Sequence, residues 1–294
     1  MSKRRGILIL LSLCLLFVGY VYLRQESHED IDQDIYLMDV VFKDLQGDLI
    51  PVKINFYNEV DIEESVRNRV TLMQTEDLIP YGLYPVLSHE LKIQDIHIDN
   101  EILTIDFNNE LYNNHPLDLL EALTFTLTDY DEIQQLQLTI DGEFIQYLPN
   151  STIPLTSLTQ NLGLNNFEET APLLHQTIPV MVYQNKTIQD FQFYVPTTIR
   201  VDENESLFSQ VQTILSYIES KIHLIDVKLQ DKTLIIHLDS NILLDNETID
   251  KTLEDLIVLS LCSLNNVENV NIQVNGEDVA VKKSSQIEYN YIKL

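Results

Sequence analysis

The chain contains the same pattern of apolar and polar residues twice, and this internal repeat limits the possible folds more than any other feature. Three pairs of segments match in the same order, and only the spacers between them differ in length: Val52–Phe56 with Phe191–Val195, Ile102–Phe107 with Thr233–Leu238, and Leu127–Gly142 with Leu261–Gly276. A repeat of roughly 135 residues is long enough for a complete domain. The sequence therefore predicts two related domains.

Each copy reads in the order β-β-α-β-β-α-β-β. Strict alternation, as in Val52–Phe56, is typical of a half-buried strand, whereas apolar spacings of three and four residues are typical of an amphipathic helix. We predict an α+β fold with two such ββαββαββ units, each a mainly antiparallel sheet with two helices on one face. The strands are expected at Val40–Lys43, Val52–Phe56, Leu91–Ile98, Ile102–Phe107, Ile133–Ile140 and Phe144–Leu148, then at Val180–Tyr183, Phe191–Val195, Ile222–Leu229, Leu234–Leu238, Val267–Val274 and Val279–Lys282. The helices are expected at Ile62–Met73, Pro116–Thr128, Leu207–Ile218 and Ile249–Leu261.

The two copies differ in one loop. The first copy carries extra residues around Ile79–Pro85, and the second has none at the matching place. Both copies end in a hairpin signal, Asp141-Gly142 and Asn275-Gly276, which favours a tight turn with positive φ. We infer that the copies share a fold but are not functionally interchangeable.

An apolar run near the N-terminus predicts a membrane anchor. Ile7–Leu23 is 17 residues without a charge, between Lys3-Arg4-Arg5 and Arg24, which is the short end of the range for a spanning helix. The basic flank predicts a cytoplasmic N-terminus, with everything after Arg24 outside the cytoplasm. No small-x-small cleavage signal follows, so we expect an uncleaved anchor. The alternative is lipidation of Cys14, although Leu13 breaks the usual lipoprotein pattern.

The sequence divides into six segments on these patterns. They are a cytoplasmic tip and anchor (1–24), a polar tether (25–34), a first domain (35–148), a connector (149–175), a second domain (176–283) and a C-terminal tail (284–294). The connector has no charge before Glu168 and is apolar enough to pack, so we expect a semi-ordered connector rather than a free linker.

The charge balance excludes nucleic acid as a partner. The formal net charge is −28, and it is −31 from Arg24 onward, because three of the 18 basic residues precede the apolar run and all 46 acidic residues follow it. Binding to a phosphate backbone depends on Lys and Arg. The chain has seven glycines and neither GxGxxG nor GxxxxGK[ST], so the common nucleotide-binding loops have no support either.

The motifs of metal and nucleophile chemistry are also missing from the sequence. None of HExxH, CxxC and GxSxG occurs, so we predict no catalytic residue, metal site or cofactor. Asp30, Asp32 and Asp34 imitate the start of an EF-hand loop, but the sixth position is Ile35 and the twelfth is Val41, which defeats the geometry. Asp202–Glu205 would attract calcium weakly or form a solvated turn, and we favour the turn.

For four further side chains we favour a structural interpretation over a functional one. Asp106, within an apolar strand, would serve a hydrolase together with a second carboxylate, but the second copy has His237 in its place, so we favour a structural carboxylate at a strand end. Cys262 is expected to be a buried, inert thiol without a disulfide partner. His97 and His237 are expected to be ordinary strand residues.

Several runs resemble the GerM family of sporulation and germination proteins. Thr104–Phe107, Thr126–Thr128, Ile133 and Ile140–Gly142 are similar to that family's strand, second helix and closing turn. Phe193–Arg200 resembles the run that opens the second domain of tandem members, and Leu158–Asn165 resembles the segment between the domains, although an arginine expected near Thr159 or Gln160 is missing.

The resemblance implies a membrane-attached extracytoplasmic protein with two domains similar to ring-building motifs. Members of this kind are assembly factors for the channel between mother cell and forespore, and usually lipoproteins. The expected function is therefore a non-catalytic one, with envelope and channel proteins as partners. The alternative is a peptidoglycan-binding module or an auxiliary to wall-lytic enzymes.

Overall fold

The computed structural model describes residues 35–57, 61–113, 116–130, 132–147, 155, 158–166, 176–244 and 248–293. The predicted anchor Ile7–Leu23, Cys14 and the aspartates of the EF-hand-like run lie outside these residues. Within the described part of the chain, no helix is long and apolar enough to cross a membrane.

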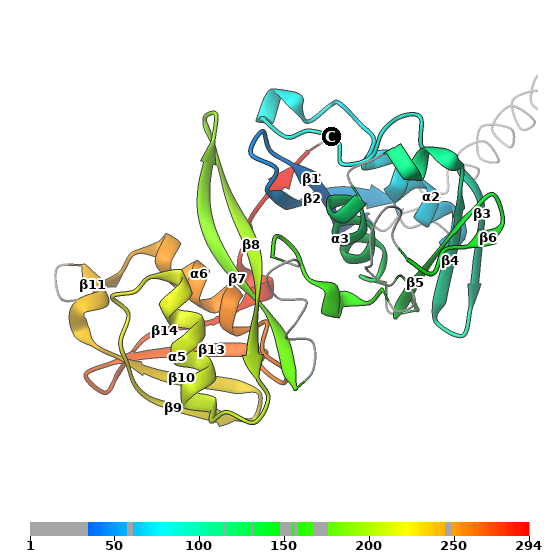
Figure 1. Ribbon diagram of the computed structural model, residues 1–294. Coiled ribbons are helices and arrows are strands. Elements are labelled where there is room, and N and C mark those ends of the chain that lie inside the picture. The colour runs from blue at the N-terminus through cyan, green and yellow to red at the C-terminus, as the bar shows by residue number, and fades with distance from the viewer. Residues whose placement is uncertain are drawn as a thin grey trace, which may run out of the picture. The chain divides into compact units, whose positions relative to one another are not determined.

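The first half of the chain forms a hairpin, two helices and a four-stranded sheet (Figure 1). Its elements are β1 (Ile35–Lys43), β2 (Leu49–Tyr57), α2 (Ile62–Leu72), β3 (Ile93–Asp99), β4 (Ile102–Phe107), α3 (Pro116–Leu127), β5 (Gln135–Ile140) and β6 (Glu143–Phe144). The sheet has the strand order β3-β4-β5-β6. Buried residues alternate with partly exposed ones along β4 and β5, as the sequence pattern predicts.

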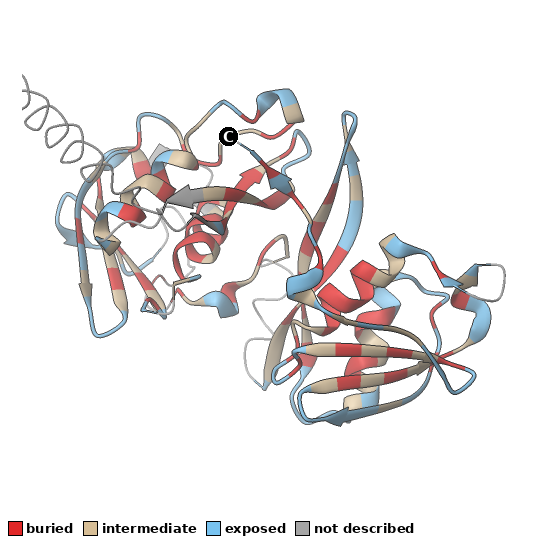
Figure 2. Cartoon of the chain, turned by 180° about the vertical axis from the view of Figure 1, so that it is seen from behind, coloured by how far each residue is buried: buried red, intermediate tan, exposed pale blue. Residues whose placement is uncertain are grey.

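The second half repeats this arrangement and adds a two-stranded hairpin and a C-terminal strand. Its elements are β7 (Thr177–Ile188), β8 (Phe191–Asp202), α5 (Leu207–Ile218), β9 (Leu224–Gln230), β10 (Thr233–Leu238), β11 (Leu243–Leu244), β12 (Thr248–Ile249), α6 (Lys251–Leu261), β13 (Asn269–Val274), β14 (Glu277–Lys283) and β15 (Tyr291–Ile292). The sheet order is β14-β13-β10-β9. The core lies where α5 and α6 meet this sheet, as the buried residues in Figure 2 show.

The mixed α+β class is confirmed, and each four-stranded sheet is mainly antiparallel with one parallel pair at its centre, but the prediction of a single sheet per copy is wrong. The central pairs β4–β5 and β10–β13 are parallel, because α3 and α6 carry the chain back to the same end of the sheet. The opening hairpins β1–β2 and β7–β8 are separate from the four-stranded sheets.

Helix hydroxyl groups explain how the hairpins stand apart from the sheets. The backbone N–H of Val41 in β1 donates to Oγ1 of Thr126 in α3. In the second half, Tyr183 of β7 donates in the same way to Ser260 of α6, and Met181 donates to Ser263. Thr126 and Ser260 are both fully buried. These hydroxyls satisfy strand N–H groups that would otherwise need another strand.

The predicted turns close as expected. Asp141-Gly142 has φ angles of 49° and 79°, and Asn275-Gly276 has 54° and 84°, which are the positive values of a tight hairpin turn. The hairpin β7–β8 is longer than its sequence pattern predicts, with 12 residues in each strand, because polar residues near its tip break the apolar alternation. Apart from Ile35, Tyr36, Phe56 and Tyr57, the described residues form one compact unit.

The connector contains a glycine that no other residue can replace without strain. Gly163 has φ +80°, and a Cβ atom there would lie 2.4 Å from Oγ1 of the buried Thr198. The same hydroxyl accepts a hydrogen bond from the N–H of Leu164. Gly163→Ala is therefore expected to lower the free energy of unfolding by about 2–4 kcal/mol, measured by chemical denaturation.

The matched control is Gly47→Ala. Gly47 also has a positive φ, +93°, but an added Cβ would meet nothing within 4 Å. Its loss should be about 1–2 kcal/mol, the cost of the backbone conformation alone. Equal losses of unfolding free energy for the two variants would show that the clash between a Cβ at position 163 and Thr198 costs nothing.

Candidate functional site

The strands β2 and β8 are joined by side-chain amides rather than by a backbone ladder, and we call this junction the amide seam. Asn165, in the connector, accepts from the N–H of Leu49 at 2.6 Å and donates to the carbonyl of the same residue at 2.7 Å. Its Nδ2 also donates to the carbonyl of Pro196 in β8 at 2.7 Å. The N–H of Asn165 donates to Glu121 of α3 at 3.0 Å. One side chain therefore behaves like a short strand between β2 and β8.

A second asparagine repeats this arrangement four residues from the end of the chain. The buried Asn290 donates through Nδ2 to the carbonyls of Pro51 and Tyr194, both at 2.8 Å, and accepts from the N–H of Tyr194 at 2.8 Å. Its carbonyl accepts from the N–H of Lys53, where β15 begins to pair in parallel with β2. The segment predicted as a tail thus contains a strand of the β1–β2 sheet.

Prolines explain why amides occupy this seam. Pro51 in β2 and Pro196 in β8 have no N–H, so a direct ladder between these strands would leave carbonyl groups without donors. Asn290 and Asn165 supply those donors, and both asparagines adopt positive φ, 51° and 63°. Asparagine tolerates this backbone conformation better than most residues.

An aromatic cluster lies next to the seam. The ring of Tyr289 packs edge-on against Tyr183 with centroids 5.7 Å apart, and stacks on Tyr194 at 6.1 Å. Lys53 places its Nζ 4.8 Å from the Tyr289 centroid and 3.0 Å from Oδ2 of Asp39. Burial raises the pKa of Tyr183 to about 12 and raises that of Tyr289 as well, so both phenols are neutral at physiological pH.

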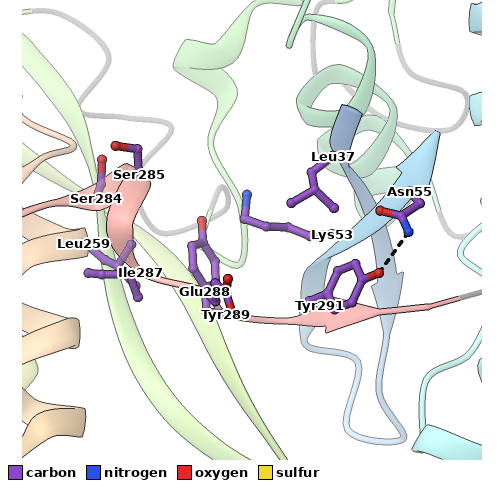
Figure 3. Close-up of a pocket in the computed structure, with 10 residues that line it drawn as sticks. All are labelled: Leu37, Lys53, Asn55, Leu259, Ser284, Ser285, Ile287, Glu288, Tyr289 and Tyr291. Atoms are coloured by element: carbon purple, nitrogen blue, oxygen red, sulfur yellow. Dashed lines mark hydrogen bonds between the residues drawn. The ribbon is translucent and has the colours of Figure 1, made fainter. Parts of the chain in front are cut away.

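A pocket of about 580 Å³ opens beside this cluster (Figure 3). It is lined by Leu37, Lys53, Asn55, Leu259, Ser284, Ser285, Ile287, Glu288, Tyr289 and Tyr291. Figure 3 shows Asn55 and Tyr291 joined by a hydrogen bond, which is 2.9 Å long. The lining combines apolar walls with hydroxyl and amide groups and the carboxylate of Glu288, and its one lysine is already paired with Asp39. This chemistry suits binding of a mixed polar and apolar group better than proton transfer.

The tip of the β7–β8 hairpin contacts the loop that only the first copy has. The rings of Tyr81 and Phe191 lie 4.8 Å apart. Gly82 ends a short 3-10 helix, Ile79–Tyr81, with φ +78°, and an added Cβ would lie 2.5 Å from Cγ2 of Ile188. The extra residues of the first copy therefore form the surface that receives this hairpin.

An ion cluster joins the same hairpin to the β1–β2 turn. Lys186 of β7 forms salt bridges with Asp44 and Asp48. Burial alone would raise the pKa of Asp44, but the hydrogen bonds from Lys186 and from the N–H groups of Asp48 and Gln46 outweigh it, and the pKa is lowered. The two carboxylates outweigh burial at Lys186 in the same way, and its pKa is raised.

Asp106 is a hydrogen-bonded strand residue, as the structural interpretation predicts. Its Oδ1 accepts from Oγ1 of Thr139 at 2.7 Å and from the N–H of Gly142 at 2.9 Å, which fixes the closing turn of the first sheet. In the second sheet His237 takes the matching position and is half-buried. His97 is exposed on β3 opposite Thr104.

The remaining candidates lie apart from the seam. Cys262 caps the end of α6 as a free, partly buried thiol, and burial raises its pKa, as expected of an inert thiol. In the 202–205 turn, Asp202 accepts from the N–H of Asn204 and Glu205 accepts from Ser209, which agrees with the turn. No three His, Cys, Asp or Glu residues in the described ranges are grouped to hold a metal ion.

No sequence pattern marks the amide seam or the aromatic cluster. The contacts of Asn290 reach residues 96 and 239 positions away, so no local pattern marks them. The usable signal was proline within a strand pattern, since Pro51 and Pro196 each mark a strand position that has no N–H to give to a neighbouring strand.

Removing the side chain of Asn290 should show how much the seam stabilises the fold. Asn290→Gly keeps the positive φ accessible but leaves the N–H of Tyr194 and two carbonyls without their partner. We expect the free energy of unfolding to fall by roughly 3 kcal/mol. Asn266→Gly, an exposed asparagine with φ 65°, is the control and should change it by less than about 0.5 kcal/mol. A loss no larger than that of the control would contradict the assignment.

The ion cluster predicts a pH-dependent contribution to stability. The lowered pKa of Asp44 means that its contribution is present above the ordinary carboxyl pKa and is lost as pH falls through the native value. The raised pKa of Lys186 means that its contribution is lost only at alkaline pH. We expect Lys186→Met to lower the melting temperature at pH 7, and the deficit to shrink as pH falls below the ordinary carboxyl pKa of about 4 towards the lower native pKa of Asp44. A deficit that is constant from pH 7 to pH 3 would refute this.

Comparison with known proteins assigns the chain to a family. The family model described as "Germane: Sporulation and spore germination" matches residues 36–146 and 184–280. These two segments together span more than half of the chain, and they fall on the two repeats. The resemblance noted from the sequence is confirmed.

Two relatives agree with this match. The Spore germination protein GerM of Bacillus subtilis (strain 168) is 26% identical over 234 residues, which are 71% of this chain and 63% of that protein's length. The solved tandem GerMN domains of the sporulation protein GerM from Bacillus subtilis match with a TM-score of 0.68 at 21% identity, covering 82% of this chain and 92% of that structure. This chain belongs to the Germane family of sporulation and spore germination proteins.

Proposed function

We propose that the protein supports the assembly of an envelope complex during sporulation or germination, as a non-catalytic, membrane-anchored and extracytoplasmic protein. The complex is of the kind that forms the channel between mother cell and forespore, and the partners are its envelope proteins. Family membership and the relative named for spore germination support the developmental role. The apolar run Ile7–Leu23 behind a basic tip supports the anchor and the topology.

The amide seam is the observation that favours an assembly role. It uses the buried side chain of Asn290 and the half-buried side chain of Asn165 to join the two repeats, and the ion cluster of Lys186 adds a second attachment. A protein that only displayed two independent binding modules would gain nothing from such a junction. Two repeats at fixed positions suit a protein that holds other proteins in a defined arrangement.

The negative electrostatic field of the protein favours protein partners with a positive surface. A net charge of −31 after the apolar run repels anionic wall polymers and raises the rate of encounter with basic surfaces. The pocket beside Tyr289 would then accept a side chain of a partner, since its lining offers neutral hydroxyl groups and apolar walls.

The test is complementation of a deletion in the endospore-forming host. Deleting the gene should lower the yield of heat-resistant or germinating spores, and the intact chain should restore it. A variant carrying Leu15→Arg and Val18→Glu, which disrupts the apolar run, should fail at equal protein level. Asp106→Asn is the matched control: it keeps an oxygen acceptor for Thr139 and Gly142, so it should restore the yield fully.

Complementation and a separate binding assay distinguish the alternatives. Failure of Asp106→Asn to complement would support the hydrolase hypothesis instead. Retention of the full chain on purified sacculi at physiological salt would support a peptidoglycan-binding module. Normal sporulation and germination of the deletion strain would overturn the proposal.

A further inference from the structure

The strand β9 is an edge strand of the second four-stranded sheet. The strand order is β14-β13-β10-β9, and within the described ranges β9 pairs with β10 alone (Figure 1). One row of its N–H and C=O groups therefore has no strand beside it. A seven-residue edge strand of this kind is a template for a further strand, unless the protein blocks it.

Apolar side chains line this margin and stay exposed. Val227 and Leu229 lie opposite the buried residues Ile236 and Leu234, so they are on the face of the sheet that α5 and α6 cover. Nevertheless, Leu229 is 39% exposed and Ile225 is 62% exposed. The helices of this half are thus too narrow to cover the last strand of their own sheet.

The other face of β9 carries one acid and one base. Asp226 lies opposite His237, and Lys228 lies opposite Ile235. Among the described residues, neither Asp226 nor Lys228 takes part in an ion pair. The strand is therefore neutral in a chain with a net charge of −28, which makes it a place where two copies can approach with little repulsion.

We propose that β9 joins two copies of this chain into a two-fold symmetric dimer by antiparallel pairing centred on Val227. This register places Asp226 opposite Lys228 of the second copy, twice, on one face. It also places Ile225, the exposed residue at the register shift between β9 and β10, across from Leu229 of the second copy. Opposite charges and apolar pairs directly across antiparallel strands are both stabilising. The contact uses the same patch from each copy, so it closes at two.

The charge pattern identifies a second copy as the occupant. A lysine on an edge strand usually prevents pairing, because a strand added beside it must place an opposite charge next to the ammonium group. Here the acid that accepts Lys228 is supplied two residues earlier by the same sequence, read in the opposite direction. A foreign strand would need an acid and a base at the matching spacing to do as well.

The other long edge strands of the two four-stranded sheets, β14 and β3, are less suited to self-pairing. In β14, Asp278 already accepts from Asn271 and Gln273, at 3.0 Å and 2.7 Å, and Lys282 already pairs with Glu254 and Asp255 of α6. In β3, the central apolar residue Ile96 is 4% exposed, so the first half covers its own margin. The strand β9 alone among these three combines exposed apolar residues with unused charges of both signs.

Cysteine cross-linking of the full chain in membranes tests the register. In a Cys14→Ser, Cys262→Ser background, Val227→Cys puts two thiols on the two-fold axis, where paired Cα atoms are about 4.5–5.5 Å apart, within disulfide range. Leu229→Cys is the control on the same face of the same strand, and its two copies would lie roughly 14 Å apart. We expect a covalent dimer on mild oxidation from Val227→Cys and almost none from Leu229→Cys.

A charge reversal tests the pairing itself. Asp226→Lys, added to Val227→Cys, sets lysine opposite lysine twice and should abolish the covalent dimer. Adding Lys228→Asp as well restores opposite charges across the axis and should restore the dimer. Sedimentation of the detergent-solubilised chain with its native cysteines should give a dimer, and a monomer for Asp226→Lys. Equal cross-linking at positions 227 and 229, or a dimer unaffected by Asp226→Lys, would overturn the proposal.

Discussion

The two side-chain amides of the seam are the interaction on which the arrangement of this molecule depends. Asn165 and Asn290 each reach both β2 and β8, and each satisfies carbonyl groups of prolines that cannot take part in a normal ladder. A buried amide left without its partners costs about 1–3 kcal/mol. The seam therefore holds only when the connector, the C-terminal strand and both hairpins are all in place, which makes their folding mutually dependent.

The difference between the repeats follows from this mutual dependence. The first copy has the loop around Ile79–Tyr81, which receives Phe191 and Ile188 from the second copy, while the second copy connects α5 to β9 in five residues. If both copies had the receiving loop and used it head to tail, the contact would continue from molecule to molecule. Because only one copy has the receiving loop, the contact is used once, within the chain. The divergence in sequence is thus a consequence of the roles that the copies play in the fold.

Local patterns were enough to predict most elements of the fold, because each depends on neighbouring residues. The alternation of Ile102–Phe107 and the turn at Asp141-Gly142 are set by residues two or three positions apart. The hydrogen bonds of Asp106 to Thr139 and Gly142 agree with the structural interpretation, although these partners lie far from it in the sequence. The seam escaped prediction because Asn290 and its partners in β2 are far apart in the chain, and asparagine has no periodic signature. The separation of the hairpins from the sheets was not predicted, because it depends on hydrogen bonds from strand N–H groups to Thr126 and Ser260. In the sequence these two residues are only polar positions within an apolar helix pattern.

These two hydroxyls connect the repeat to the seam. If the hairpins β1–β2 and β7–β8 joined the four-stranded sheets, each would give up an edge to its own repeat. Thr126 and Ser260 bind one strand of each hairpin instead. The other strands, β2 and β8, present an edge to the amides of Asn165 and Asn290, and β2 also pairs with β15 on that side. A small polar side chain on the second helix of each copy is therefore a precondition for joining the copies. Replacing either hydroxyl by an apolar side chain would remove the acceptor from a buried strand N–H, and its effect would extend to the seam as well as to its own repeat.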